Sequence, residues 1–377
     1  MSTLELSGDR QLVEEIIAAI ERADDGSISF HDYMNMCLYQ DKCGYYMKPE
    51  SKIGKDGDFY TSSSMGPFMG QMLAARFAQY MSDNRGIELP SITEWGSGTG
   101  KLALQILDEL QNVYPEIYNN ITYDLIEVSP YHQVLQRELL HVHKHKIRFI
   151  DAQNWWEMPP LHDAIIFSNE LLDAFPIHLV KKFNGRYQEV YVSYDQTSGQ
   201  FVEGLHPIPE EDELAAYIEQ FQINGAEGHT IEINLAADSW IRRIGSKMKS
   251  GMLITIDYGD EASELYAAHR HIGTLMCYHQ HIAHQNPYIH IGNQDITSHI
   301  NFSSCIRIGN ECGFTNYTYQ TQRQFLIDQG ILSKLQDHAW TDPFHPVVKS
   351  NRAIRQLLIG DSMSELFKVL IQHREGD

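Results

Sequence analysis

The spacing of apolar residues predicts that the chain begins with two helices. In the first helix, apolar side chains recur every three or four positions, at Leu12, Val13, Ile16, Ile17 and Ile20. Residues 29–32, Ser-Phe-His-Asp, resemble a capping box, a pattern whose side chains satisfy backbone amides where a helix starts. We therefore expect a second helix from this box through Leu38.

Short apolar strands then alternate with amphipathic helices. Strands are predicted at residues 92–95, 123–128, 147–150 and 164–167, and helices at 102–110 and 134–140. Such alternation is typical of a parallel sheet with helices on both faces. The predicted fold class is therefore α/β, with a doubly wound, Rossmann-like sheet that is mostly parallel.

Antiparallel strands are expected to follow the fourth strand. The turn dipeptide Asn184-Gly185 divides the β-rich run 178–194 and predicts a hairpin. Residues 236–249 have the pattern of a helix, which we expect Gly251 to close as a left-handed cap. The apolar strand that follows, 252–256, ends in Asp-Tyr-Gly, which should point into the same crevice as the other strand ends.

Two segments fall outside this alternation. Residues 44–70 are rich in Gly, Ser, Lys and Asp with aromatics between them. We expect them to form a lid over a bound ligand, with Asp58, Thr61 and Ser62 near it; the alternative is that their aromatics only dock the first helices. Residues 262–300 hold seven of the 19 histidines without any metal-ligand spacing, so we expect an insertion that lines the crevice, and no metal site.

This reading predicts two domains. Residues 1–84 would form an N-terminal helical cap with the glycine-rich lid, and residues 85–377 the sheet domain with its histidine-rich insertion at about 262–300.

The composition excludes several classes of protein. The formal net charge of -21 repels phosphate backbones, so we expect no nucleic-acid partner. No stretch approaches the roughly 18 consecutive apolar residues of a membrane span, so no membrane insertion is expected. Five cysteines without CxxC spacing indicate reduced thiols, and no leader is apparent, so we expect a cytoplasmic protein. The oligomeric state is left open, with a homodimer as one option.

The first candidate for chemistry is the glycine-rich loop at residues 94–100, Glu-Trp-Gly-Ser-Gly-Thr-Gly. It follows the first strand, at the edge where parallel sheets bind ligands, and its glycines let a ligand approach the backbone. A dinucleotide fingerprint would need glycine at position 101, where the chain has Lys101. The loop therefore favours an S-adenosylmethionine enzyme over a dehydrogenase, although a glycine turn can also serve helix packing alone.

Two acids at strand ends support this interpretation. Glu127 ends the second strand, where its carboxylate could accept hydrogen bonds from a ribose diol. Asp151 closes the third strand and could face an adenine edge, with a simple helix cap as the alternative.

The fourth strand delivers Asn169, Glu170 and Asp173 to the same edge. If the chain turns helical there, Glu170 and Asp173 share one face beside the reacting methyl group. Paired carboxylates could orient a guanidinium and receive its proton. The alternative is that Glu170 complements a helix dipole and Asp173 caps locally.

Taken together, nine short sequence blocks of this chain resemble those of the MidA family of methyltransferases. They occur in the family's order: 44–46, 53–54, 57–62, 94–100, 125–129, 169–174, 257–259, 273–275 and 294–297. The chain departs from the family at Ser63 and Ser64, where Pro-Glu is usual, which puts acceptor contacts of that loop in doubt. It also has Trp95 in place of an aliphatic residue, a change that we expect to affect packing only.

The resemblance implies a methyltransferase sheet with an N-terminal helical cap and S-adenosylmethionine as the donor. Mitochondrial members look like arginine methyltransferases that act in the assembly of respiratory complex I, so a protein that presents an arginine is the expected partner. Predicted donor-binding residues are Glu94, Gly96, Ser97, Gly98, Gly100, Glu127, Val128, Asp151, Ala152, Asn169, Thr61 and Ser62. Predicted catalytic residues are Glu170, Asp173 and Asn169.

Three other interpretations stay open at this point. The acceptor could be a small molecule or another protein side chain. The chain could be an assembly chaperone that binds S-adenosylmethionine without turnover, or a nicotinamide dehydrogenase.

Overall fold

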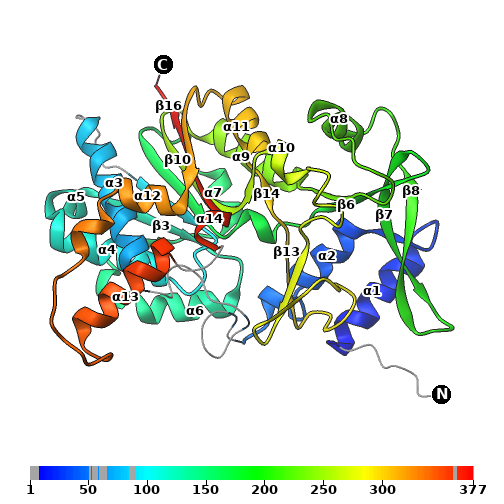
Figure 1. Ribbon diagram of the computed structural model, residues 1–377, viewed down its shortest axis with the longest axis horizontal. Coiled ribbons are helices and arrows are strands. Elements are labelled where there is room, and N and C mark those ends of the chain that lie inside the picture. Colours follow the sequence, from blue (N-terminus) through cyan, green and yellow to red (C-terminus); the bar gives the residue numbers. More distant parts are fainter. Residues whose placement is uncertain are drawn as a thin grey trace.

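The computed structural model describes residues 8–50, 52, 58, 66–84, 91–359 and 363–376. Its centre is a sheet of eight strands in the order β15-β16-β10-β5-β2-β3-β4, with β14 beside β10 (Figure 1). The strands are β2 (Ser91–Trp95), β3 (Thr122–Ile126), β4 (Ile147–Phe149), β5 (Ala164–Asn169), β10 (Gly251–Asp260), β14 (Ile300–Asn301), β15 (Asn316–Thr321) and β16 (Phe367–Arg374).

The central sheet is mostly parallel. Strands β4, β3, β2, β5, β10 and β14 pair in parallel, whereas β16 pairs antiparallel with both β10 and β15. Since β2 lies between β3 and β5, the strand order reverses there, which is where such sheets form a ligand crevice. The predicted α/β class and doubly wound sheet are confirmed.

Both faces of this sheet are buried, because its central strands β5 and β10 carry apolar residues on both sides. Ile165 and Phe167 of β5 face one core, and Ala164 and Ile166 face the other. The first core is covered by α3 (Phe68–Asp83), α4 (Lys101–Val113), α5 (Pro115–Asn120), α12 (Gln322–Asp328) and α13 (Pro346–Ile359). The second is covered by α7 (Ala152–Glu157), α9 (Leu235–Lys247) and α11 (Phe302–Glu311).

A second, antiparallel sheet lies beside the first, on the right of Figure 1. It consists of β1 (Ile28–Ser29), β6 (His178–Phe183), β7 (Arg186–Asp195), β8 (Gln200–Pro207) and β9 (Thr230–Ile233). Helices α1 (Arg10–Arg22) and α2 (Phe30–Tyr39) pack on it through a core that joins Leu12 and Phe30 to Val190 and Val192. Helix α8 (Glu213–Gln220) packs on β6 and β9.

The remaining elements are short. The histidine-rich insertion forms a three-stranded sheet of β11 (Met276–His279), β12 (Ile282–His284) and β13 (Asp295–Thr297). Helices α6 (Pro130–Leu139), α10 (Ala262–Leu265) and α14 (Met363–Leu366), with 3-10 turns at Tyr45–Met47, His141–His143, Leu172–Ala174 and Ile331–Lys334, complete the described elements. None of the helices in these ranges has the length and apolar character that crossing a membrane requires.

Most predicted elements are confirmed, including the hairpin at Asn184-Gly185 and the cap of α2, where Ser29 accepts from the Asp32 amide. Gly251 is a correction, because it does not close α9 but begins β10, with φ 142°. A Cβ on Gly251 would lie 2.1 Å from the Ala164 carbonyl oxygen, so close strand pairing requires glycine there.

The packing of the N-terminal segments bears on the predicted division at residue 84. Helices α1 and α2 pack on the second sheet, whereas α3 belongs to the core of the central sheet. The division into a cap and a sheet domain therefore stays a prediction about folding units. Gly70, expected in the lid, lies inside α3.

Candidate active site

A cavity of about 280 Å³ opens at the carboxyl ends of β2, β3 and β5. Its lining residues are Tyr39, Tyr46, Glu94, Trp95, Gly96, Ser97, Gly98, Thr99, Lys101, Leu102, Ile126, Glu127, Val128, His132, Asn169, Glu170, Leu171, Ala174 and Phe175. The cavity lies where the strand order predicts it. No residue of the fully described range 262–300 lines it, so the expectation that the histidine-rich insertion lines the crevice was wrong.

The glycine-rich loop forms one wall because its backbone bends in a way that glycine permits. Gly96, Gly98 and Gly100 have φ of 69°, 51° and 79°, in the left-handed region. A Cβ on Gly96 would lie 2.8 Å from Leu171 Cδ1, and one on Gly100 would lie 3.0 Å from Gln136 Cγ. These glycines let the loop pack tightly while its backbone faces the cavity.

Helix α6 holds this loop from behind. The Gln136 amide donates to Ser97 Oγ at 2.9 Å and to the Gly98 carbonyl oxygen at 2.6 Å. Ser97 and Gly98 line the cavity, whereas Gly100 lies outside its lining as the first residue before α4. The predicted donor residues of this loop are thus brought together, with Gly100 in a supporting position.

Glu127 is fixed at the centre of the wall. Its carboxylate accepts from the Gly98 amide at 2.7 Å and from the Ser129 amide at 2.8 Å. Burial raises its pKa to about 7. Each oxygen keeps a further lone pair, so the carboxylate can also accept from two hydroxyls of a ribose, which fits an adenosyl ligand.

His132 is a cavity residue that the sequence analysis missed. Its Nδ1 lies 3.9 Å from Glu127 Oε1, and burial lowers its pKa to about 4, so the ring is neutral at physiological pH. Its position in the first turn of the helix after Glu127 is a signal that could have identified it.

Glu94 and Trp95 line the floor of the cavity. Glu94 accepts from the Tyr123 hydroxyl at 2.7 Å, and burial raises its pKa to about 8. Trp95 was expected to serve packing only; it packs edge-on against Trp155 and Trp240 but also lines the cavity.

Asp151 and Ala152 lie away from the cavity lining. The Asp151 carboxylate is exposed and caps α7, accepting from the Gln153 amide at 2.8 Å and the Asn154 amide at 3.4 Å. These contacts are those of the helix-cap alternative. Val128, by contrast, lines the cavity.

The segment after β5 does not form the predicted helical face. Glu170 has φ 55°, in the left-handed region, and the chain then makes a 3-10 turn at Leu172–Ala174. Glu170 lines the cavity with Asn169, whose amide donates to Glu170 Oε1 at 2.9 Å. Asp173 points away from the lining and is buried, so the two carboxylates do not share one helix face.

Asp257 holds this turn in place. Its carboxylate accepts from the amides of Leu172 at 2.9 Å and of Leu171 and Asp173 at 3.3 Å. Asp257 was expected to point into the crevice; instead it lies behind the turn and binds its backbone. Asn234, the residue that caps the start of α9, also supports the turn, because its side chain donates to the Leu172 carbonyl oxygen at 2.8 Å.

Two tyrosines from the N-terminal segment complete the cavity. The rings of Tyr39 and Tyr46 stack at 5.5 Å between centroids, and both line the cavity. Asp58, expected near the donor, instead accepts from the Tyr45 hydroxyl and the Gln280 amide, at 2.7 Å and 2.6 Å. Thr61 and Ser62 lie outside the described residues.

Comparison with known proteins identifies the family and the cofactor of this chain. Residues 72–320 match the model of a family of S-adenosyl-L-methionine-dependent methyltransferases. A Burkholderia thailandensis crystal structure with S-adenosyl-homocysteine bound has 31% identity and a TM-score of 0.85, and the similarity covers 97% of this chain and 92% of that one.

Two curated relatives are protein arginine methyltransferases named as mitochondrial. The Danio rerio protein is 25% identical over 87% of this chain and 77% of its own length. The Drosophila melanogaster homologue is 23% identical over 78% of this chain and 69% of its own length. The names of these relatives contradict the cytoplasmic location expected from the sequence, which depended on the lack of an apparent leader.

The family model spans most of the chain, and its residues build the glycine-rich loop and Glu127 into one cavity wall. The chain therefore belongs to this family of S-adenosylmethionine-dependent methyltransferases.

Proposed function

We propose that the enzyme methylates a guanidinium nitrogen of a protein arginine. The observation that carries the proposal is Glu170, a carboxylate on the cavity wall beside the donor loop. The curated relatives named as protein arginine methyltransferases support the same acceptor.

The lining residues would serve two roles, donor binding and acceptor binding. Gly96, Ser97, Gly98 and Glu127 would hold the donor, which supplies a methyl group on a positively charged sulfur. Glu170 would orient the guanidinium through charge-assisted hydrogen bonds. Methylation replaces one N–H proton of the guanidinium, and the Glu170 carboxylate would receive that proton.

The geometry also accounts for how Glu170 keeps its position. The Glu170 backbone amide donates to the Ile256 carbonyl oxygen at 2.9 Å, and the Asn169 side-chain amide donates to the Glu170 carboxylate. A left-handed residue other than glycine costs about 1 kcal/mol or more, so neighbouring contacts must hold it. Such a fixed carboxylate suits catalysis by orientation.

Methyl transfer into a cell extract tests the acceptor. Protein extract is incubated with donor labelled in the methyl group, and labelled amino acids are identified after hydrolysis. We expect labelled methylarginine with the wild-type enzyme and none with Gly98→Val, whose side chain would enter the donor site from a left-handed residue.

Gly199→Val is the matched control for that experiment. Gly199 has φ 69° in the turn between β7 and β8 of the second sheet and does not line the cavity, so it bears similar backbone strain outside the donor site. Label in methyl-lysine or in a small-molecule fraction would contradict the arginine proposal.

A further inference from the structure

Three buried carboxylates lie directly behind the turn that carries Glu170. Asp173, Asp257 and Asp295 are 5%, 0% and 2% exposed, and we call them the carboxylate cluster. The Asp173 amide donates to Asp257 at 3.3 Å, and its carbonyl oxygen accepts from Ser298, next to β13, at 3.0 Å. Three distant segments of the chain therefore converge here.

One positive charge, Lys52, acts on Asp295 and favours its charged form, but the Lys52 ammonium is itself paired with Glu50 at 3.3 Å. No ion pair among the described residues includes any of the cluster's three members, and Asp173 Oδ1 is buried without a hydrogen-bond partner. Burial, together with repulsion from Asp257 and Asp295, raises the pKa of Asp173 well above its usual range. Burial raises the pKa of Asp257 and of Asp295 to about 7.

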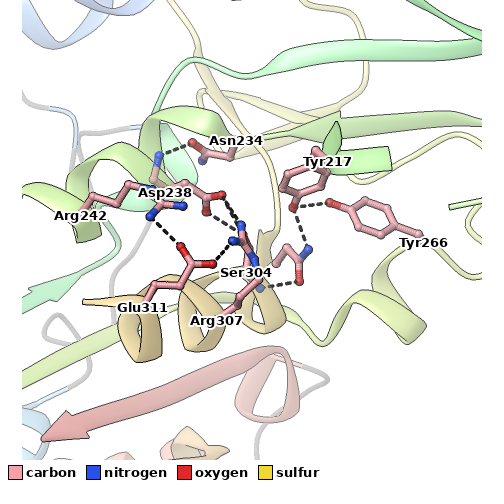
Figure 2. Close-up of polar contacts among 10 residues, drawn as sticks. Tyr217, Asn234, Asp238, Arg242, Tyr266, Ser304, Arg307 and Glu311 are labelled. Atoms are coloured by element: carbon pink, nitrogen blue, oxygen red, sulfur yellow. Dashed lines mark hydrogen bonds and ion pairs between the residues drawn. The ribbon is translucent and has the colours of Figure 1, made fainter. Parts of the chain in front are cut away.

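Another buried carboxylate of the protein, Asp238, shows how a buried negative charge is usually compensated. Asp238 on α9 accepts from Ser304 Oγ of α11 at 2.7 Å and lies 3.5 Å from Arg307 of the same helix (Figure 2). Arg242 and Glu311 extend this network with an ion pair at 2.7 Å (Figure 2). Buried charge is normally compensated in this way, so the carboxylate cluster is suited to a cation that comes from outside the described chain.

The tyrosine pair connects the carboxylate cluster to the open cavity. The Tyr46 hydroxyl donates to Asp295 at 2.8 Å, and the Tyr39 hydroxyl donates to the Ala174 carbonyl oxygen at 2.9 Å. Both hydroxyls are therefore turned to the protein, while the two residues line the cavity that Glu170 also lines. Aromatic rings beside carboxylates form a favourable environment for a planar cation.

We propose that the acceptor binds as a cation between Glu170 and the Tyr39–Tyr46 pair, with the carboxylate cluster as its buried counter-charge. Asp295 and Tyr46 are thereby specificity-determining residues, supplied by the histidine-rich insertion and the N-terminal segment. The inference rests on the proposed arginine methylation. It adds the residues by which the enzyme would distinguish a positively charged acceptor from a neutral one.

Equilibrium binding without turnover tests the proposal. The probes are N-acetyl-arginine amide and its neutral isostere N-acetyl-citrulline amide, measured by titration NMR on enzyme saturated with S-adenosylhomocysteine. We expect the arginine probe to bind at least about tenfold more tightly, the scale of one charge-assisted contact. Asp295→Asn should remove most of this preference and leave the affinity for S-adenosylhomocysteine unchanged.

Two further variants guard against a folding artefact. Tyr46→Phe keeps the ring and removes only the hydrogen bond to Asp295, so it should reduce the preference in a folded protein. Asp238→Asn changes a buried carboxylate of the network in Figure 2, away from the cavity lining, and should leave the preference intact.

The outcomes separate this inference from the proposed function. Equal binding of the two probes, no binding of either at millimolar concentration, or an unchanged preference in Asp295→Asn and Tyr46→Phe would overturn the cation site, even if methylarginine is formed. Label in methyl-lysine in place of methylarginine in the extract experiment, with the preference for the charged probe intact, would leave the cation site standing and overturn arginine as the acceptor.

Discussion

At the scale of single residues, substitutions of Glu127 and of Asp151 should have different effects, although both acids follow a strand. Glu127→Ala should weaken donor binding by about 1 to 3 kcal/mol, since it removes charge-assisted hydrogen bonds. Asp151→Ala should leave donor affinity unchanged and lower the free energy of unfolding by about 1 kcal/mol through the lost helix cap. Calorimetry and denaturant unfolding of both variants check this, and an unchanged donor affinity in Glu127→Ala would make its carboxylate structural.

Glu170→Gln should separate binding from turnover. The amide keeps the size of the side chain but cannot take a proton, so kcat should fall by about 100-fold or more while the donor Kd changes little. Steady-state kinetics with a methylarginine readout, together with calorimetry of donor binding, measure both quantities. Turnover near that of the wild type would remove Glu170 from the catalytic role.

At the scale of elements, the contact between α3 and α4 depends on Gly70. A Cβ there would lie 2.3 Å from Gln105 Cβ, so Gly70→Ala should push the helices apart and cost about 1 to 3 kcal/mol of unfolding free energy. Gly204→Ala is the control, because its nearest neighbour would be the Tyr191 carbonyl oxygen at 4.0 Å. Equal stability of the two variants in urea would contradict this packing argument.

Elements with a strong local pattern were predictable from the sequence. The strands before Gly96 and Glu127 and the turn at Asn184-Gly185 follow from apolar runs and turn chemistry that neighbouring residues specify. Glu170 was placed at the right edge but in the wrong conformation. Its left-handed backbone is set by contacts with Asn169 and with β10, and no local spacing encodes those.

The rest of the site could not be derived from local pattern because it is assembled from distant segments. Tyr39 and Asp295 reach the region of Glu170 only when the second sheet and the histidine-rich insertion have packed against the central sheet. Asp257 was visible as the end of an apolar strand, but whether its carboxylate faces the cavity or the turn depends on tertiary contacts.

At the scale of the whole molecule, buried acids should make stability depend on pH. Burial raises the pKa of Glu94 to about 8, so the folded state holds a proton that the unfolded state releases above its ordinary pKa of 4.5. The stability associated with this proton is complete below that ordinary pKa and is lost as pH rises toward 8.

Glu94→Gln removes this dependence because an amide resembles the protonated acid. The variant should gain stability relative to the wild type between pH 5 and 8, by at most about 1.4 kcal/mol per pH unit. Unfolding by denaturant across this pH range measures the difference. A difference that stays constant would show that Glu94 holds the same charge throughout.

The position of β16 has a consequence for synthesis on the ribosome. Among the described strands, β15 pairs only with β16, and the same strand pairs with β10 on that side; β16 is also the last of these elements to be synthesised. Until residues 367–374 have left the exit tunnel, the apolar edge of β10 stays unpaired and open to wrong partners. A nascent chain halted before residues 367–374 emerge should therefore stay bound to chaperones. These chaperones should dissociate once β16 has paired with β10.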